Sequence, residues 1–381
     1  MKITKVDVFP VKIPFQRPYE IASAVYTHQP LVVLKVHTDE NVWGLGEACP
    51  AYEFTGETAG TVENILNERL IPVILNQDPF NIEAITADLN SAVVGNASAK
   101  AAVDIALHDI VGKATGQPVC NIIGGVTKSR ISVTGQIGMA SVSESIETCK
   151  RKAEEGVSTF KIKVGKHHND DLLLLKGIRE ALGPGPRIWI DANQGWKTAD
   201  RAARVIRKLE KYDIELVEQP IPSWDFKGLS RIRSKVNVPV MLDESVHSPM
   251  DAMRAIQEEA CDVISIKLMK SGGIHNALKL NGISEAAGIV CHMGTMLESS
   301  IGVSANLHVI AALSNIKYWE ADIPTTESGL ADDTSTGLNI TSEQGCCCMT
   351  VPQKPGLGVS LQEEALRKHR IDWGSWRPAG T

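Results

Sequence analysis

Three acidic side chains follow short apolar runs and could together hold a metal ion. Asp191 ends RIWID, Glu218 ends IELVE and Asp243 ends VPVMLD. If these runs are neighbouring parallel strands, about 4.8 Å apart, the three carboxylates converge on one point. Their repulsion would raise their pKa values unless a cation lies between them. Hard oxygen ligands suit one Mg²⁺ ion, although any single carboxylate could instead cap the following helix.

Three lysines could supply acid–base groups beside that cation. Lys161 and Lys163 are two residues apart in TFKIKVG, so both side chains point to the same face of a strand. Lys267, in SIKLM, would approach from across the fold. Mutual repulsion and the cation are expected to lower the pKa values of the paired lysines, which makes a neutral amine available near neutral pH. Taken alone, Lys161 and Lys163 could belong to a solvent-exposed strand face. Lys267 could form a salt bridge to a nearby acid.

Two opposed bases and one Lewis acid define a class of reaction. A carboxylate bound to Mg²⁺ becomes an electron sink, so one lysine can remove the proton from the adjacent carbon. The second lysine can return a proton to the other face. The residues therefore predict abstraction of the α-proton of a small carboxylate substrate.

These residues stand at the ends of a repeated strand-and-helix pattern. After the glycines at 124–125, strand-like runs begin near residues 131, 159, 187, 214, 238, 262, 289 and 317, with helical stretches such as ADRAARVIRKLEKY between them. Eight such units predict an α/β fold, a (β/α)-barrel of the modified TIM type with its site at the carboxyl ends of the strands. A doubly wound sheet is the alternative, but no Gly-rich phosphate motif follows a strand here.

The first 125 residues predict a separate α+β capping domain. Residues 6–13 and 31–38 are interpreted as strands joined by a loop at 15–30, and WGLGEACP (43–50) as a closing unit with glycines at turns. The clearest helix has Ser98 as its expected N-cap and Gly116 as its stop. We expect a capping domain over 1–125, a barrel over 126–350 and a tail over 351–381 that returns to the capping domain.

Bulk composition excludes several classes of function. The 381 residues are 43% hydrophobic and 22% charged, with a net charge of −6 and no basic cluster, so no nucleic-acid partner is expected. No apolar run reaches the roughly 18 residues that span a bilayer, and the start lacks a signal-peptide core. We therefore expect a cytoplasmic protein with no membrane partner. The cysteine triplet at 346–348 is interpreted as small residues rather than a soft-metal or redox site.

Six motifs in order resemble one known family. They are KIKVG, DANQGW, ELVEQP, MLDES, IKLMKSGG and GTMLESSIG. With the N-terminal unit and the closing PGLG, the chain resembles the muconate-lactonizing subgroup of the enolase superfamily from end to end. Lysine bases with Mg²⁺ are the general chemistry of that superfamily. Within the subgroup, the chain is most similar to dipeptide epimerases of the Ala-Glu type.

The resemblance implies roles for the matching residues. They are Lys163 and Lys267 as the two bases, Lys161 as the auxiliary lysine, and Asp191, Glu218 and Asp243 as the ligands of one Mg²⁺ ion. Glu320 and Asp322 match the acidic pair that holds the α-ammonium group of a dipeptide, with glutamate replacing the first aspartate. Further candidates are Tyr26, Thr27, Glu53, Met296 and Glu298 as substrate contacts, Asn193 and Glu244 as supports of the metal ligands, and His292 as a packing or polar lining residue.

Three functions stay open. The first is an epimerase of dipeptides or other amino-acid derivatives, which the acidic pair favours because it attracts an ammonium group. The second is an o-succinylbenzoate synthase, an N-acylamino acid racemase or a muconate cycloisomerase on the same scaffold. The third is a non-catalytic protein that kept the fold, against which the complete set of acids and lysines argues. The exact substrate and the oligomeric state are left open, and a homo-oligomer is compatible with the sequence.

Overall fold

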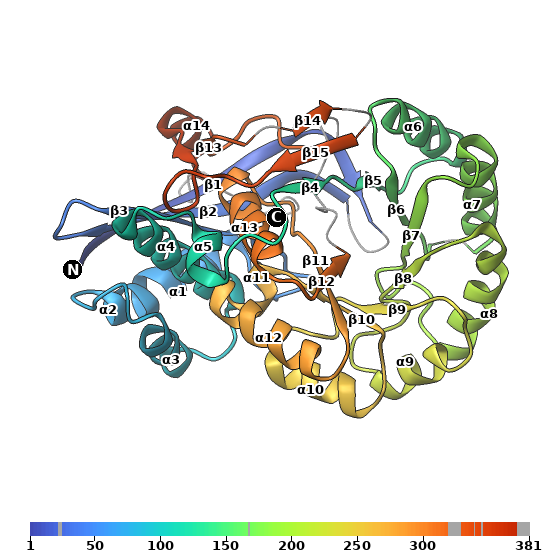
Figure 1. Ribbon diagram of the computed structural model, residues 1–381, viewed down its shortest axis with the longest axis horizontal. Helices are drawn as coiled ribbons and strands as arrows, with labels where there is room; N and C mark the ends of the chain where they lie inside the picture. The colour runs from blue at the N-terminus through green and yellow to red at the C-terminus, as the bar shows by residue number, and fades with distance from the viewer. Residues whose placement is uncertain (22–24, 167, 319–328, 339, 344–345, 372–381) are drawn as a thin grey trace, which may run out of the picture.

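The computed structural model describes residues 1–21, 25–166, 168–318, 329–338, 340–343 and 346–371. A capping unit, on the left in Figure 1, stands beside a curved sheet of parallel strands on the right. The predicted fold class is confirmed, because a barrel-like parallel sheet follows an N-terminal α+β unit. The domain boundary near residue 125 stays a prediction.

The capping unit begins with an antiparallel sheet and continues as helices. Its elements are β1 (Ile3–Glu20), β2 (Val25–Thr38), β3 (Trp43–Ala48), α1 (Ala59–Ile65), η1 (Leu66–Leu70), α2 (Ile71–Ile74), α3 (Ile82–Ala92), α4 (Ala97–Thr115) and α5 (Val119–Ile123). The pairing of β1 with β2 shifts register beyond Pro14 and resumes with Tyr19 opposite Tyr26. The strands therefore extend through most of the loop predicted at 15–30, helped by this aromatic cross-strand pair.

Two glycines of β3 let the strand lie directly against α4. A Cβ atom on Gly44 would stand 2.2 Å from Ala106 O, and one on Gly46 would stand 1.8 Å from Ala102 O. The prediction of turns at these glycines is wrong, because both lie inside a strand. Their missing side chains allow the close approach of strand and helix.

Of the two predicted ends of α4, the C-terminal one is confirmed and the N-terminal one is wrong. The N-cap is Asn96, so the predicted N-cap at Ser98 is wrong. The carboxylate of Glu57 accepts hydrogen bonds from Ser98 N and Ala99 N, at 3.0 and 3.1 Å, and satisfies amide groups that the first helical turn leaves unpaired. The stop at Gly116 is confirmed, with a left-handed φ of 68°.

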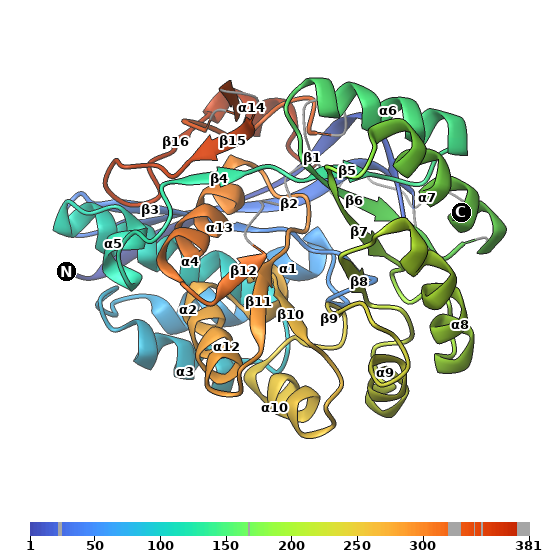
Figure 2. The ribbon, with the colours of Figure 1, turned by 45° about the vertical axis from the view of Figure 1, so that its right-hand side comes forward.

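In the described residues, the barrel-like sheet has eight parallel strands in sequence order. They are β5 (Gly135–Ile137), β6 (Thr159–Lys163), β7 (Arg187–Asp191), β8 (Leu216–Glu218), β9 (Val240–Leu242), β10 (Val263–Ile266), β11 (Val290–Met293) and β12 (Ile316–Tyr318). The connecting helices are α6 (Val142–Glu154), α7 (His168–Leu182), α8 (Ala199–Leu209), η2 (Glu210–Tyr212), α9 (Phe226–Arg233), α10 (Pro249–Gln257), α11 (Leu268–Ser271), α12 (Ile274–Ala286) and α13 (Ser300–Ala312). Figure 2 shows α6 to α10 outside the curved row of strands.

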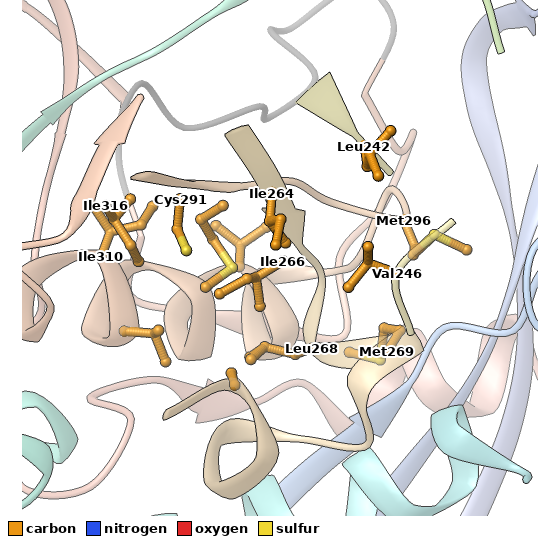
Figure 3. Packing of buried hydrophobic residues seen from close by; sticks show 14 of the residues in the cluster. Leu242, Val246, Ile264, Ile266, Leu268, Met269, Cys291, Met296, Ile310 and Ile316 are labelled. Atoms are coloured by element: carbon orange, nitrogen blue, oxygen red, sulfur yellow. The ribbon is translucent and has the colours of Figure 1, made fainter. Parts of the chain in front are cut away.

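Helical spacing of apolar residues explains how these helices cover the sheet. In α8, Ala202, Ile206 and Leu209 are buried, while its arginines and lysine occupy the rest of the helix. The same packing occurs between the sheet and α13. Figure 3 shows Ile264 of β10 and Ile310 of α13, which belong to one buried hydrophobic cluster. No helix among the described residues is long and apolar enough to cross a membrane.

The first predicted barrel run, ISVTGQIG, divides between two sheets. β4 (Arg130–Ser132) pairs antiparallel with β15 (Cys346–Thr350), which also pairs with β14 (Ile340–Glu343), and only β5 joins the barrel. The cysteine triplet therefore begins a strand, where Cys347 and Cys348 are buried.

The C-terminal segment returns to the first sheet, through Arg370 of the predicted tail and also through Leu330, which precedes that tail. Its elements are β13 (Ser335–Thr336), β16 (Ser360–Leu361) and α14 (Glu363–Lys368). Isolated bridges join Phe15 to Leu330 and Val11 to Arg370. In Figure 1 the red C-terminal elements accordingly lie over β1.

A buried glutamate joins the capping unit to the barrel. Glu47 of β3 accepts hydrogen bonds from Ser299 N, at 2.9 Å, and from the Ser299 hydroxyl. Ser299 is the N-cap of α13, so the contact ties the sheet of one unit to a helix of the other. Burial raises the pKa of Glu47 to about 8.

We expect Glu47 to make the protein less stable as pH rises from about 4.5 to about 8. In this range the folded carboxyl keeps its proton and the unfolded one loses it, so the free energy of unfolding falls by up to about 1.4 kcal/mol per pH unit. Glu47→Gln is neutral throughout and should remove this slope. Urea unfolding at both pH values measures it, with the exposed Glu364→Gln as control. If the free energy of unfolding depends equally on pH in wild type, Glu47→Gln and Glu364→Gln, the raised pKa of Glu47 is contradicted.

Candidate active site

Strand register brings a lysine and two carboxylates into one row. Lys163 is paired with Asp191 across β6 and β7, and Asp191 with Glu218 across β7 and β8. Asp243 directly follows β9. The three carboxylates are no more than 1% exposed. The residues predicted to bind metal thus gather at the same ends of successive strands.

Alternation along the strands explains why these groups point into the barrel. Trp189, Leu216 and Met241 each precede one of the carboxylates by two residues, and with Val263 they form a separate buried cluster. Residues two apart share a face of a strand, so this cluster is the apolar layer beneath the carboxylates. His292 of β11 packs edge-on against Trp189, with 5.5 Å between ring centroids, which agrees with its expected packing role.

Each carboxylate of this group has a lysine ammonium group close by. Lys163 Nζ lies 2.6 Å from Asp191 Oδ2, and Lys161 Nζ lies 3.4 Å from the same oxygen. Lys161 Nζ is also 2.8 Å from Glu218 Oε2. Lys267 Nζ lies 2.7 Å from Asp243 Oδ2. Buried charges persist in proteins when they are paired in this way.

Ion pairs act against the predicted pKa shift of Lys163. Burial acts to lower its pKa, but Asp191, with smaller effects of Tyr19 and Glu218, outweighs burial and raises the pKa of Lys163 above its usual value. The effect of Asp191 also exceeds that of Lys161, which acts in the opposite direction. Without a cation, nearby carboxylates therefore outweigh the second lysine, and the lowered pKa, which requires the cation as well as Lys161, stays a prediction.

A pocket opens beside Lys161, Lys163 and Lys267. Tyr19, Tyr26 and Phe54 of the capping unit line it together with Gln136 and Lys267. The Phe54 ring centroid is 4.7 Å from Lys267 Nζ, and the Tyr19 hydroxyl donates a hydrogen bond to Gln136 Oε1 at 2.8 Å. The barrel therefore supplies the charged part of the pocket and the capping unit supplies aromatic walls.

Two of the predicted substrate contacts, Tyr26 and Met296, line this pocket. Glu53 lies beside Tyr26, and burial together with this carboxylate raises the pKa of the tyrosine. Tyr26 therefore keeps its hydroxyl proton and stays a hydrogen-bond donor near neutral pH.

The remaining predicted contacts lie away from the pocket lining or outside the described chain. Glu298 is buried and accepts a hydrogen bond from Met296 N at 2.8 Å. Thr27 is exposed, with its hydroxyl 2.9 Å from the ring of His28. Glu320 and Asp322 lie outside the described residues.

Asn193 links the carboxylates to one lysine, in the position expected of a supporting residue. Its backbone N donates to Asp191 Oδ1 at 2.9 Å, and its Oδ1 accepts from Lys163 Nζ at 3.0 Å. Its Nδ2 donates to Glu244 Oε1 at 3.2 Å. Burial and the charge of Asp243 raise the pKa of Glu244 to about 7.

The donor chemistry of this group fits a divalent cation. Among the described residues, neither oxygen of Glu218 has a hydrogen-bond partner apart from the nearby charge of Lys161, and burial together with Asp191 raises the pKa of Glu218 to about 8. Buried carboxylate oxygens without hydrogen bonds are suited to Mg²⁺. Within the described residues, no three acidic, histidine or cysteine side chains already form a metal-binding cluster. Ammonium groups of the lysines stand among the carboxylates, and Asp191, Glu218 and Asp243 would hold the ion.

One charged residue of the site, Lys270, was not singled out from the sequence. It is 1% exposed and its Nζ lies 2.8 Å from Asp243 Oδ1. The available signal was its place three residues after Lys267, because side chains at that spacing lie on one side of a helical turn. Tyr19 and Phe54 were also missed, since only the tertiary fold brings the capping unit to the pocket.

Comparison with known proteins identifies the class. Residues 3–124 match the family model "Mandelate racemase / muconate lactonizing enzyme, N-terminal domain", and residues 144–365 match "Enolase C-terminal domain-like". The chain therefore belongs to the enolase superfamily, as its motifs predicted.

Several members of this superfamily are similar over almost the whole chain. The solved N-succinyl Arg/Lys racemase of Bacillus cereus has a TM-score of 0.93 and 33% identity, covering 98% of this chain and 99% of its own. The L-Ala-D/L-Glu epimerase of Clostridium acetobutylicum is 37% identical over 94% of this chain and 99% of its own. A dipeptide epimerase of Enterococcus faecalis, solved with Mg and L-Leu-L-Tyr, has a TM-score of 0.88 and 35% identity over 94% and 100%. Chloromuconate cycloisomerases are also similar, and all of these relatives are isomerases.

Replacing Asp191 should remove a buried ion-pair partner and also a predicted metal ligand. We expect Asp191→Asn to lower the free energy of unfolding by about 3–5 kcal/mol, because Lys163 and Lys161 lose their shared carboxylate. It should also abolish any rise in melting temperature on adding Mg²⁺. Thermal melts with Mg²⁺ or EDTA measure both effects, with Asp200→Asn, in an exposed ion pair, as control. A Mg²⁺-dependent rise of wild-type size in Asp191→Asn would exclude Asp191 as a ligand.

Proposed function

We propose that this chain is a Mg²⁺-dependent racemase or epimerase with one cation per site. Of Lys163 and Lys267, one would remove the α-proton of a carboxylate substrate and the other would deliver a proton to the opposite face. One observation carries the proposal: the two ammonium groups reach the same pocket from opposite parts of the sheet. β6 carries Lys163 and β10 leads directly into Lys267, and these strands are four apart in the eight-stranded order.

The two lysines then meet the α-carbon of a bound substrate from opposite faces. One lysine, in its neutral form, takes the α-proton, and the other, in its ammonium form, delivers a proton to the opposite face. Their protonation states are exchanged after each inversion. Mg²⁺ supplies Lewis-acid stabilisation of the charge that develops on the substrate carboxylate. Lys161, paired with Asp191 and Glu218, holds these carboxylates in place.

Dipeptides are the substrate class that we propose first. The relative from Enterococcus faecalis is solved with a dipeptide, and the relative from Clostridium acetobutylicum is an L-Ala-D/L-Glu epimerase. The aromatic side chains of Tyr19, Tyr26 and Phe54 offer apolar surface for a substrate side chain. N-acylated amino acids form the second class, because the Bacillus cereus relative is an N-succinyl Arg/Lys racemase.

Solvent deuterium distinguishes epimerisation from the alternatives. Incubated with Mg²⁺ and pooled L,L-dipeptides in D₂O, the protein should label at least one dipeptide with one deuterium at Cα, which mass spectrometry detects. N-succinyl amino acids and muconate are tested in parallel. Turnover of muconate with every dipeptide and acyl-amino acid unlabelled would sink the epimerase proposal in favour of a cycloisomerase. No turnover of any class, with no response to Mg²⁺, would favour a non-catalytic protein.

Removing either base should stop exchange from one stereoisomer. Lys163→Ala and Lys267→Ala should each abolish epimerisation, while each still exchanges the α-proton of the isomer that faces its remaining lysine. Proton NMR of the two separate stereoisomers in D₂O measures the exchange. The exposed Lys166→Ala is the control and should exchange both isomers. Epimerisation at the wild-type rate by either base variant would show that the two-base assignment is wrong.

A further inference from the structure

Asp243 has a different lysine at each of its two oxygens, whereas the two lysines next to Asp191 approach the same oxygen. Lys267 Nζ lies 2.7 Å from Oδ2, and Lys270 Nζ lies 2.8 Å from Oδ1. Lys270 is part of no prediction made from the sequence. Its carboxylate partner is completely buried, and its own side chain is 1% exposed.

The ammonium group of Lys270 has no capacity left for acid–base work. It donates hydrogen bonds to Asp243 Oδ1, to the main-chain oxygen of Asp243 and to Ser265 O. A lysine ammonium group has three protons to donate, so these acceptors use all of them. Lys267, in contrast, lines the pocket, whereas Lys270 does not. Lys270 therefore does not touch the substrate space.

The local backbone places the two lysines on two sides of one carboxylate. Lys267 is the N-cap of the one-turn helix α11, and Lys270 lies inside that turn. Gly272 and Gly273, with φ of 86° and 109°, end the turn at once. Met269, between the lysines, accepts a hydrogen bond from Cys49 N at 3.3 Å through its sulfur, which anchors the turn to the capping unit.

We propose that Lys270 is a positioning residue that clamps Asp243 and so increases the affinity of the site for its divalent cation. The inference rests on the proposed function, because it assumes that Asp243 is a ligand. Two effects of opposite sign compete. A positive charge next to a ligand repels a cation, whereas the hydrogen bond to Oδ1, from an ammonium group that two main-chain oxygens hold in place, fixes the orientation of the ligand. Supporting partners of metal ligands typically contribute 10- to 100-fold in affinity, so we infer that the clamp dominates.

A matched pair of substitutions separates these effects. Lys270→Met and Lys267→Met each remove one ammonium group that contacts an oxygen of Asp243, but only Lys270→Met removes the clamp. Isothermal titration calorimetry with MgCl₂ measures the dissociation constant without any substrate. We expect Lys270→Met to weaken Mg²⁺ binding by about 10- to 100-fold, and Lys267→Met to bind Mg²⁺ as tightly as wild type or more tightly.

Lys270→Gln provides a second variant, because Lys270→Met leaves two buried main-chain oxygens without a donor and could unfold the protein. The amide of glutamine still donates hydrogen bonds, so its affinity for Mg²⁺ should lie between those of wild type and Lys270→Met. Wild-type affinity in either Lys270 variant overturns the clamp and leaves the proposed function standing. Equal weakening in the Lys267 and Lys270 variants also overturns it. A wild-type protein that binds no Mg²⁺ overturns the proposed function, and the clamp with it.

Discussion

Charge balance inside the barrel is the constraint on which the rest of this structure depends. Four lysines and four carboxylates meet at the carboxyl ends of β6 to β10, namely Lys161, Lys163, Lys267, Lys270, Asp191, Glu218, Asp243 and Glu244. An unpaired ion at this depth would cost several kcal/mol. The charged side chain at the end of each strand must therefore lie next to a side chain of opposite charge. A slip of one residue would turn a whole strand's charges toward the helices. Electrostatics thus fixes the same register as the backbone hydrogen bonds.

The capping unit lies over this charged end because its acidic side chains bind the N-termini of barrel helices. Two of its acidic side chains accept hydrogen bonds from backbone amides where barrel helices begin: Asp104 at Ile274 of α12, and Glu47 at Ser299 before α13. Oxygen acceptors are favoured at helix N-termini because the first amides of a helix have no partner within it. In a βα unit the helix starts near the carboxyl end of the preceding strand, which is also where the site forms. The same docking contacts therefore bring the aromatic residues of the capping unit to the pocket.

The sequence predicted the parts of this arrangement that depend on local periodicity. Two-residue alternation and the spacing of the apolar runs place Lys163, Asp191 and Glu218 on one side of adjacent strands, and the register agrees. Features that depend on distant partners were missed. The N-cap at Ser98 failed because Glu57, far away in sequence, meets those amides. The closeness of Asp191 to Lys163, which raises the pKa of the lysine in the absence of a cation, also depends on side-chain distances that spacing does not contain.

The contact between β3 and α4 has a consequence for protein engineering. With a hypothetical Cβ on Gly46 only 1.8 Å from a helix carbonyl, neither strand glycine can be exchanged without separating sheet from helix. The strand leads within a few residues to the segment that carries Phe54. The two glycine positions are thus fixed by the contact with the helix, whereas Phe54 lies beyond that contact. Libraries that aim to change the substrate of the enzyme should vary the residues around Phe54 and keep Gly44 and Gly46 unchanged.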